Sequence, residues 1–129
     1  MNYERRITFR EFQDAQHDWL LERNLDTTIQ TQAEKLMEEM PEAQEALAIL
    51  QSDYTTENEK KFAEELVDVI IVSLGLIAIM GMDSERMIED KYQRNSVKYD
   101  LQTMLELQAQ GMTPRESMFE MKRRWNETV

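Results

Sequence analysis

The scarcity of chain breakers is the feature of this sequence that most constrains its fold. Only three glycines and two prolines occur in 129 residues. These two residue types disfavour helix interiors most strongly. No stretch alternates cleanly between apolar and polar side chains, as a half-buried strand would. The sequence therefore predicts an all-α protein, a compact bundle of about five helices.

Helix starts are marked by threonine followed three residues later by glutamate or glutamine, the pattern of a capping box. Such pairs begin at Thr8, Thr27, Thr56 and Thr113, and Gly81 suits a helix C-terminus. The predicted helices cover residues 8–23, 27–51, 57–80, 84–98 and 114–126.

Composition narrows the functional class. With 41% hydrophobic and 32% charged residues, the chain has the profile of a soluble globular domain. Its net charge of −11 argues against nucleic-acid binding, although a divalent cation would let carboxylates approach a nucleotide. The chain has no cysteine, which excludes disulfides and thiolate metal sites. Together with an N-terminus that lacks a signal-like apolar core, this favours a cytoplasmic location.

Two apolar patterns indicate how the helices pack. Residues 66–82 are mostly apolar but number only 17 and include Asp68. This favours a buried core helix over a membrane span, and a helix apolar nearly all round needs cover, which a neighbouring subunit would provide. In the preceding helix one apolar stripe is predicted, formed by Ala33, Leu36, Met37, Met40, Ala43 and Leu47.

Carboxylates are concentrated in the segment EKLMEEMPEAQEAL, where five of fourteen residues are glutamate. Glu39 and Glu42 are three residues apart and share a helix face, as Glu65 and Asp68 do on the next helix. If the two helices pack antiparallel, both pairs lie at similar distances from the connecting loop. Four carboxylates would then converge, with Asp68 partly buried. All-oxygen ligands select Mg²⁺, with Mn²⁺ as an alternative.

A simpler interpretation is that these carboxylates only form solvated helix faces. Glu-x-x-Glu is common on solvated helix faces, and the EEMPE segment alone favours that interpretation. EELVD is harder to explain in this way, because its aspartate enters an apolar segment and a buried unpaired carboxylate is costly. Taken together, the two segments favour a metal site.

Three elements resemble the all-alpha nucleoside triphosphate pyrophosphohydrolases of the MazG-like superfamily. The family pattern E-E-x-x-E, a spacer and E-x-x-D corresponds to EEMPE at residues 38–42 and ELVD at residues 65–68. The family's K-x-x-x-N-x-x-[KR]-Y segment corresponds to KYQRNSVKY at residues 91–99. The resemblance covers roughly residues 8–100, so a domain is expected over 1–100. Residues 101–129 would form a helical extension that packs on this domain or on a neighbouring subunit.

The resemblance implies hydrolysis of a nucleoside triphosphate between the α and β phosphates, giving the monophosphate and pyrophosphate. It assigns Mg²⁺ binding to Glu39, Glu42, Glu65 and Asp68. Glu38 would orient or deprotonate the attacking water. Substrate would be bound by Lys91, Asn95, Lys98 and Tyr99. Relatives form oligomers, so a homodimer or homotetramer is expected.

Trp19 has two interpretations. It could stack on the nucleobase, or it could pack in the core with Phe12, which lies on the same helix face seven residues earlier. Two rival functions also remain. The helices could form a non-catalytic interaction module whose acidic cluster binds a cation or a basic partner. A di-iron bundle is disfavoured, because such bundles pair Glu-x-x-His motifs and this chain has a single histidine.

Overall fold

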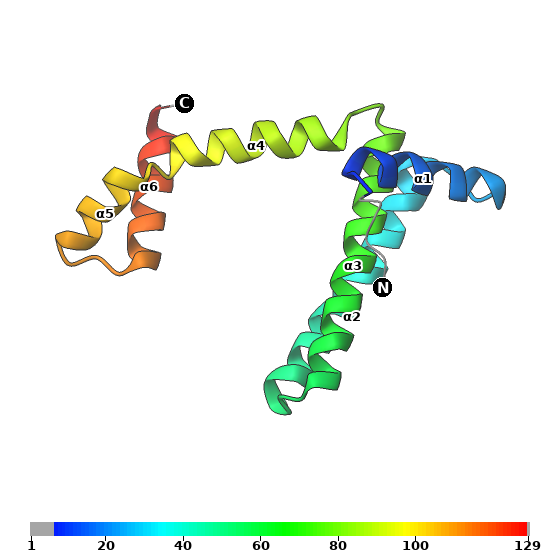
Figure 1. The fold of residues 1–129 in the computed structure, drawn as a ribbon, viewed down its shortest axis with the longest axis horizontal. Coiled ribbons are helices and arrows are strands. Elements are labelled where there is room, and N and C mark those ends of the chain that lie inside the picture. The colour runs from blue at the N-terminus through cyan, green and yellow to red at the C-terminus, as the bar shows by residue number, and fades with distance from the viewer. Residues whose placement is uncertain (1–6, 129) are drawn as a thin grey trace. The chain divides into compact units, whose positions relative to one another are not determined.

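Helices account for almost all of the chain in the computed structural model, which describes residues 7–128 (Figure 1). No strand occurs in that range. The helices are α1 (Phe9–Glu22), α2 (Ile29–Ser52), α3 (Thr56–Ile79), α4 (Ser84–Lys98), α5 (Leu101–Ala109) and α6 (Pro114–Thr128). The predicted all-α class is confirmed, and α5 is added to the five helices expected from the sequence.

Local capping explains where these helices begin and end. Thr8 accepts from the Glu11 amide at 3.1 Å, and Thr113 and Glu116 form the complete reciprocal box. The predicted caps Thr27 and Thr56 are wrong by one residue, because Thr28 and Thr55 accept the first-turn amides. Gly81 follows α3 with φ of +73°, a conformation that favours glycine.

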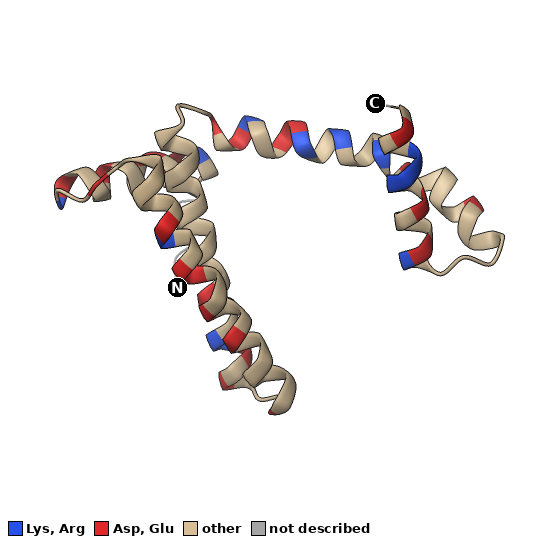
Figure 2. Cartoon of the chain, turned by 180° about the vertical axis from the view of Figure 1, so that it is seen from behind, with Lys and Arg blue, Asp and Glu red and all other residues tan. Residues whose placement is uncertain are grey.

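The chain divides into two compact units, one up to Glu85 and one from Arg86 onward. The domain boundary expected at residue 100 came from the family resemblance and stays a prediction. The first unit carries a net charge of −12 and the second +1, counted over the full sequence. Figure 2 shows this difference as many acidic bands on α1 to α3 and more frequent basic bands on α4 and α6.

In the first unit, α2 and α3 form an antiparallel hairpin, and α1 packs against α3 (Figure 1). The buried side of α2 carries the small residues Ala43 and Ala46, which allow close approach of α3, and ends in Leu50. On α3 the main buried apolar side chains are Val72 and Leu74. The predicted antiparallel pair that carries the carboxylates is therefore confirmed.

The predicted apolar stripe of α2 is wrong for three of its six members, and Ala33 and Leu36 are half-buried. Met37, Met40 and Leu47 are exposed, whereas Ala43 is buried. Helix packing here uses small side chains, so the bulky side chains project away from α3. On α3, Leu66, Val67 and Ile70 are also exposed, so residues 7–128 leave part of this helix uncovered. Within residues 7–128, no single helix is long and apolar enough to cross a membrane. In that range, only α3 combined with the helical segment that follows it reaches the required length and composition, and a break separates the two.

The second unit contains most of α4 and the hairpin formed by α5 and α6. Asp100 caps α5 by accepting from the Thr103 amide at 3.0 Å. Leu107 and Met121 are buried between α5 and α6, and the fully buried Ser117 hydroxyl donates to the Pro114 carbonyl at 2.6 Å. The extension predicted from residue 101 onward is thus helical.

Candidate metal centre

Three carboxylates from two helices converge in the middle of the α2–α3 hairpin. Glu39 and Glu42 come from α2, and Glu65 comes from α3. One oxygen from each side chain lies within 4.8 Å of the other two. Octahedral metal–oxygen bonds of about 2.1 Å place neighbouring ligand oxygens closer than this, so only small side-chain movements are needed to bind one ion.

Two of these carboxylates are buried and incompletely bonded. Glu39 and Glu65 are each 8% exposed. The Oε2 atom of each is buried and has no hydrogen-bond partner among the described residues. An ionised oxygen that loses water without gaining a partner is strongly destabilising. A divalent cation between the two helices would satisfy both oxygens at once.

A lysine holds the other oxygen of each buried carboxylate. Lys35 Nζ lies 3.1 Å from Glu39 Oε1, and Lys61 Nζ lies 2.8 Å from Glu65 Oε1. Each lysine is four residues before its glutamate on the same helix, the spacing that places side chains side by side. These ion pairs leave the two Oε2 atoms unsatisfied, so the lysines do not replace a cation in the gap.

Glu42 completes the cluster from the exposed side. Its pKa is raised above the ordinary glutamate value, chiefly by hydrogen bonding with the Glu39 carboxyl and by the negative charge of that group. Partial desolvation and the charge of Glu65 act in the same direction. The cluster therefore has an affinity for positive charge, which a proton or a metal ion can supply.

Asp68 departs from the prediction. It is exposed rather than partly buried, and it lies outside the group of three converging carboxylates. The packed face of α3 includes Glu65 and Val72, which are seven residues apart and nearly in line along the helix. Asp68 is rotated from Glu65 by about 60°, because each residue turns the helix by about 100°. It therefore lies on the flank of the hairpin, where it lines an adjoining pocket.

This pocket, which we call the α1–α3 pocket, has a volume of about 680 Å³ and is bounded by α1, α2 and α3. Its apolar wall includes Trp19, Leu20 and Ile71. Trp19 is 45% exposed, so it is not a core residue in this chain. The guanidinium of Arg23, which does not line the pocket, lies 4.1 Å from the Trp19 ring centre and covers one ring face. The lining also includes Glu38, Asp68 and Glu39, the last of which belongs to the three converging carboxylates.

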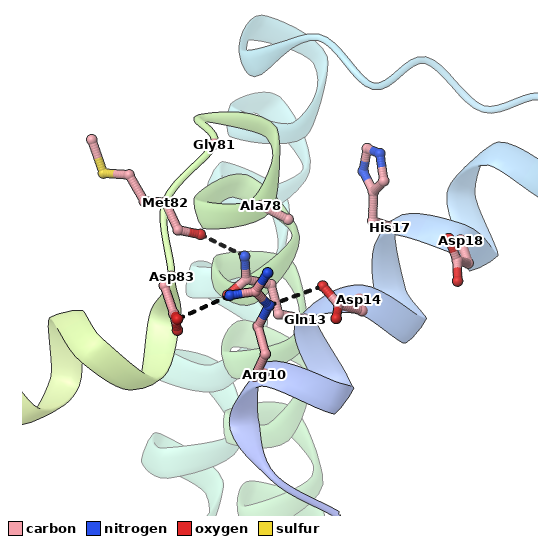
Figure 3. A pocket seen from close by; sticks show the side chains of 9 residues that line it. All are labelled: Arg10, Gln13, Asp14, His17, Asp18, Ala78, Gly81, Met82 and Asp83. Carbon is pink, nitrogen blue, oxygen red and sulfur yellow. Dashed lines mark hydrogen bonds and ion pairs between the residues drawn. The ribbon is translucent and has the colours of Figure 1, made fainter.

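A second pocket lies between α1 and the turn after α3 (Figure 3). Arg10 bridges Asp14 at 3.3 Å and Asp83 at 2.9 Å. Gln13 is buried, donating to the Met82 carbonyl at 2.6 Å and accepting from the Ser84 amide at 2.8 Å. These interactions fix α1 to the start of α4, so Gln13 has a structural role and its amide is already used.

The remaining predicted substrate residues run from the middle of α4 to the residue after it, in the second unit. Lys91 is exposed, whereas Asn95, Lys98 and Tyr99 are half-buried. Lys98 Nζ lies 5.2 Å from the Tyr99 ring centre, within cation–π range. Their assignment to phosphate binding stays a prediction.

Sequence reasoning did not identify Lys35 and Lys61 as parts of the centre. The available signal was a lysine four residues before two of the predicted metal ligands, Glu39 and Glu65. Comparison of the chain with protein-family models, with curated proteins and with solved structures gave no match. The case for a function therefore depends on the site itself and on the sequence resemblance.

Proposed function

We propose that this protein is a Mg²⁺-dependent nucleoside triphosphate pyrophosphohydrolase, which converts a ribo- or deoxyribonucleoside triphosphate to the monophosphate and pyrophosphate. The observation that carries the proposal is the pair of buried, unpartnered Oε2 atoms of Glu39 and Glu65, placed beside Glu42 and next to a pocket of nucleoside size. The order of the three sequence elements supports the same function. Such an enzyme would act on nucleotide pools in the cytoplasm.

The ligand set suits magnesium. Glu39, Glu42 and Glu65 offer carboxylate oxygens, the ligands that hard divalent cations prefer. When bound, Mg²⁺ would withdraw charge from phosphate oxygens and lower the pKa of bound water. Mg²⁺ usually retains exchangeable positions for water and substrate phosphate, which a three-carboxylate site leaves open. Asp68, at the edge of the pocket, is available as a further ligand or as a partner of a metal-bound water.

The α1–α3 pocket would receive the nucleoside. Its apolar wall and the Trp19 ring suit a flat base, and stacking on an aromatic side chain is favourable for any base. Glu38 lines the same pocket at the metal end, with a largely exposed carboxylate that can orient an attacking water. Lys91, Asn95, Lys98 and Tyr99 remain the proposed residues for phosphate and sugar.

A homodimer or homotetramer is part of the proposal. Bulky apolar side chains project from both helices of the hairpin, and they include Met37 and Met40 on α2 and Val67 and Ile70 on α3. A second copy of the chain would remove this surface from water, which favours association.

The decisive experiment is pyrophosphate release from a panel of canonical and modified nucleoside triphosphates with Mg²⁺. We expect turnover of at least one substrate and a loss of at least 100-fold in Glu39→Gln, which removes a ligand charge at nearly constant shape. Glu45→Gln is the matched control, because Glu45 is exposed on the same helix and lies outside the cluster and the pocket. A folded protein that binds Mg²⁺ but turns over no nucleotide would instead be the non-catalytic module.

A further inference from the structure

Lys35 occupies a position that the metal centre alone does not explain. Its ammonium bridges Glu39 Oε1 at 3.1 Å and Glu38 Oε2 at 3.7 Å, and its side chain is 52% exposed. It also lines the α1–α3 pocket, whereas Lys61, which pairs with Glu65 in the same way, does not. Each lysine therefore pairs with one buried carboxylate, but Lys35 also contacts Glu38 and has access to the pocket.

The charge of the pocket makes this difference important. Its described lining contains five acidic residues, Asp26, Glu34, Glu38, Glu39 and Asp68, and Lys35 is the single cation among them. A polyphosphate entering this pocket would be repelled by every charged wall residue except Lys35. Metal ions would offset part of that repulsion, and Lys35 is the one lining side chain that can offset more.

Metal binding would also release Lys35 from its present partner. In the structure, the Glu39 carboxylate holds the Lys35 ammonium through its Oε1 atom at 3.1 Å. A divalent cation on Glu39 would neutralise that carboxylate and weaken its attraction for the lysine. The long, half-exposed side chain is then free to turn toward an anion in the pocket without any change in the backbone.

Resting on the proposed function, we propose that Lys35 is a substrate-binding residue, which pairs with Glu39 in the structure and would move to the phosphates of a metal-bound polyphosphate. Lys61 retains its carboxylate pairing throughout. This gives the α1–α3 pocket a phosphate contact from α2.

The test compares Lys35→Met with Lys61→Met; each removes one positive charge and one ion pair with a buried carboxylate while keeping the aliphatic stem, and Lys35→Met also removes the longer contact with Glu38. Binding of Mn²⁺ alone is measured by electron paramagnetic resonance. Binding of the preformed Mg²⁺ complex of inorganic triphosphate, in excess Mg²⁺, is measured by calorimetry. We expect Mn²⁺ affinities of the two variants within about threefold of each other. Triphosphate affinity should fall about tenfold or more in Lys35→Met only, because loss of a charged hydrogen bond to phosphate typically reduces affinity by this factor.

Lys35→Arg should retain most of the triphosphate affinity, because arginine also carries charge to phosphate. Equal losses of triphosphate affinity in the two methionine variants, or no loss in Lys35→Met, would overturn the inference while leaving the proposed function intact. Failure of the wild-type protein to bind Mn²⁺ would instead remove the proposed function, and this inference with it. Failure of the Mg²⁺-loaded wild type to bind triphosphate would overturn the inference directly.

Discussion

Glu65→Gln should make the metal-free protein more stable and the Mg²⁺-loaded protein less stable than the wild type. The Glu39 and Glu65 carboxylate oxygens lie within 4.8 Å of each other. At an effective dielectric constant near 20, two unit charges at that distance repel by about 3 kcal/mol. Glutamine removes this repulsion, and its amide can donate to the unpartnered Oε2 of Glu39.

Two losses reduce the gain. The ion pair with Lys61 disappears, and because the Lys61 side chain is 63% exposed, solvent screening keeps the contribution of this pair small. Side-chain relaxation and water already lower the repulsion in the wild type. We therefore expect a net stabilisation of about 1–2 kcal/mol without metal. That corresponds to an increase in Tm of roughly 5–10 °C for a cooperative unit of this size.

Magnesium should reverse the order of stability, so that the wild type becomes more stable than Glu65→Gln. Ligand that binds only the native state adds about 2.7 kcal/mol at a concentration 100 times Kd. The wild type should gain this stabilisation and Glu65→Gln should lose most of it. Calorimetric melting in EDTA and in excess Mg²⁺ measures both effects, with Glu64→Gln as the control for charge alone on an exposed neighbouring position. A Glu65→Gln variant that melts lower than the wild type in EDTA and keeps the full Mg²⁺ shift would refute the assignment of this cluster.

Three further outcomes are expected. Asp68→Asn should lower turnover at least tenfold. It should reduce Mn²⁺ affinity less than Glu39→Gln does, because Asp68 lies outside the converging carboxylates. Equal losses of Mn²⁺ affinity in the two variants would instead make Asp68 a full ligand. Gln13→Leu should lower the free energy of unfolding by about 2–4 kcal/mol in urea denaturation, because the Ser84 amide and the Met82 carbonyl both lose their buried partner. A change below about 1 kcal/mol would contradict the structural role of Gln13. The pKa of Glu120 is lowered to about 2, first by its hydrogen bond from Arg123. Its stabilising contribution is therefore complete above the ordinary value of 4.5 and is lost as pH falls toward 2. Glu120→Gln should accordingly show a smaller decrease in Tm between pH 5 and pH 2 than the wild type, and parallel profiles would disprove the shift.

Helix positions follow from the sequence because their signals are local. The Thr113–Glu116 box and the glycine at position 81 act through hydrogen bonds and backbone angles within one turn. The missed helix α5 also had a local signal, since Asp100 is a favourable capping residue. The spacing of acidic residues likewise identified the two carboxylate-bearing segments. Like charges three or four residues apart on a helix repel each other, so such a cluster indicates a stabilising cation or proton.

Which side chains meet was decided by tertiary packing. Spacing alone treats Glu65 and Asp68 as equivalent partners on one face of a helix. Contact with the small residues of α2 selects one line along α3 for burial, and the 60° between the two acids places Glu65 in the gap and Asp68 on the flank. On α2, the same helix contact leaves Met37 exposed and Glu39 buried. A sequence determines where each helix lies along the chain, but the rotation of one helix against another depends on contacts distant in sequence, and that rotation decides which oxygens can share an ion.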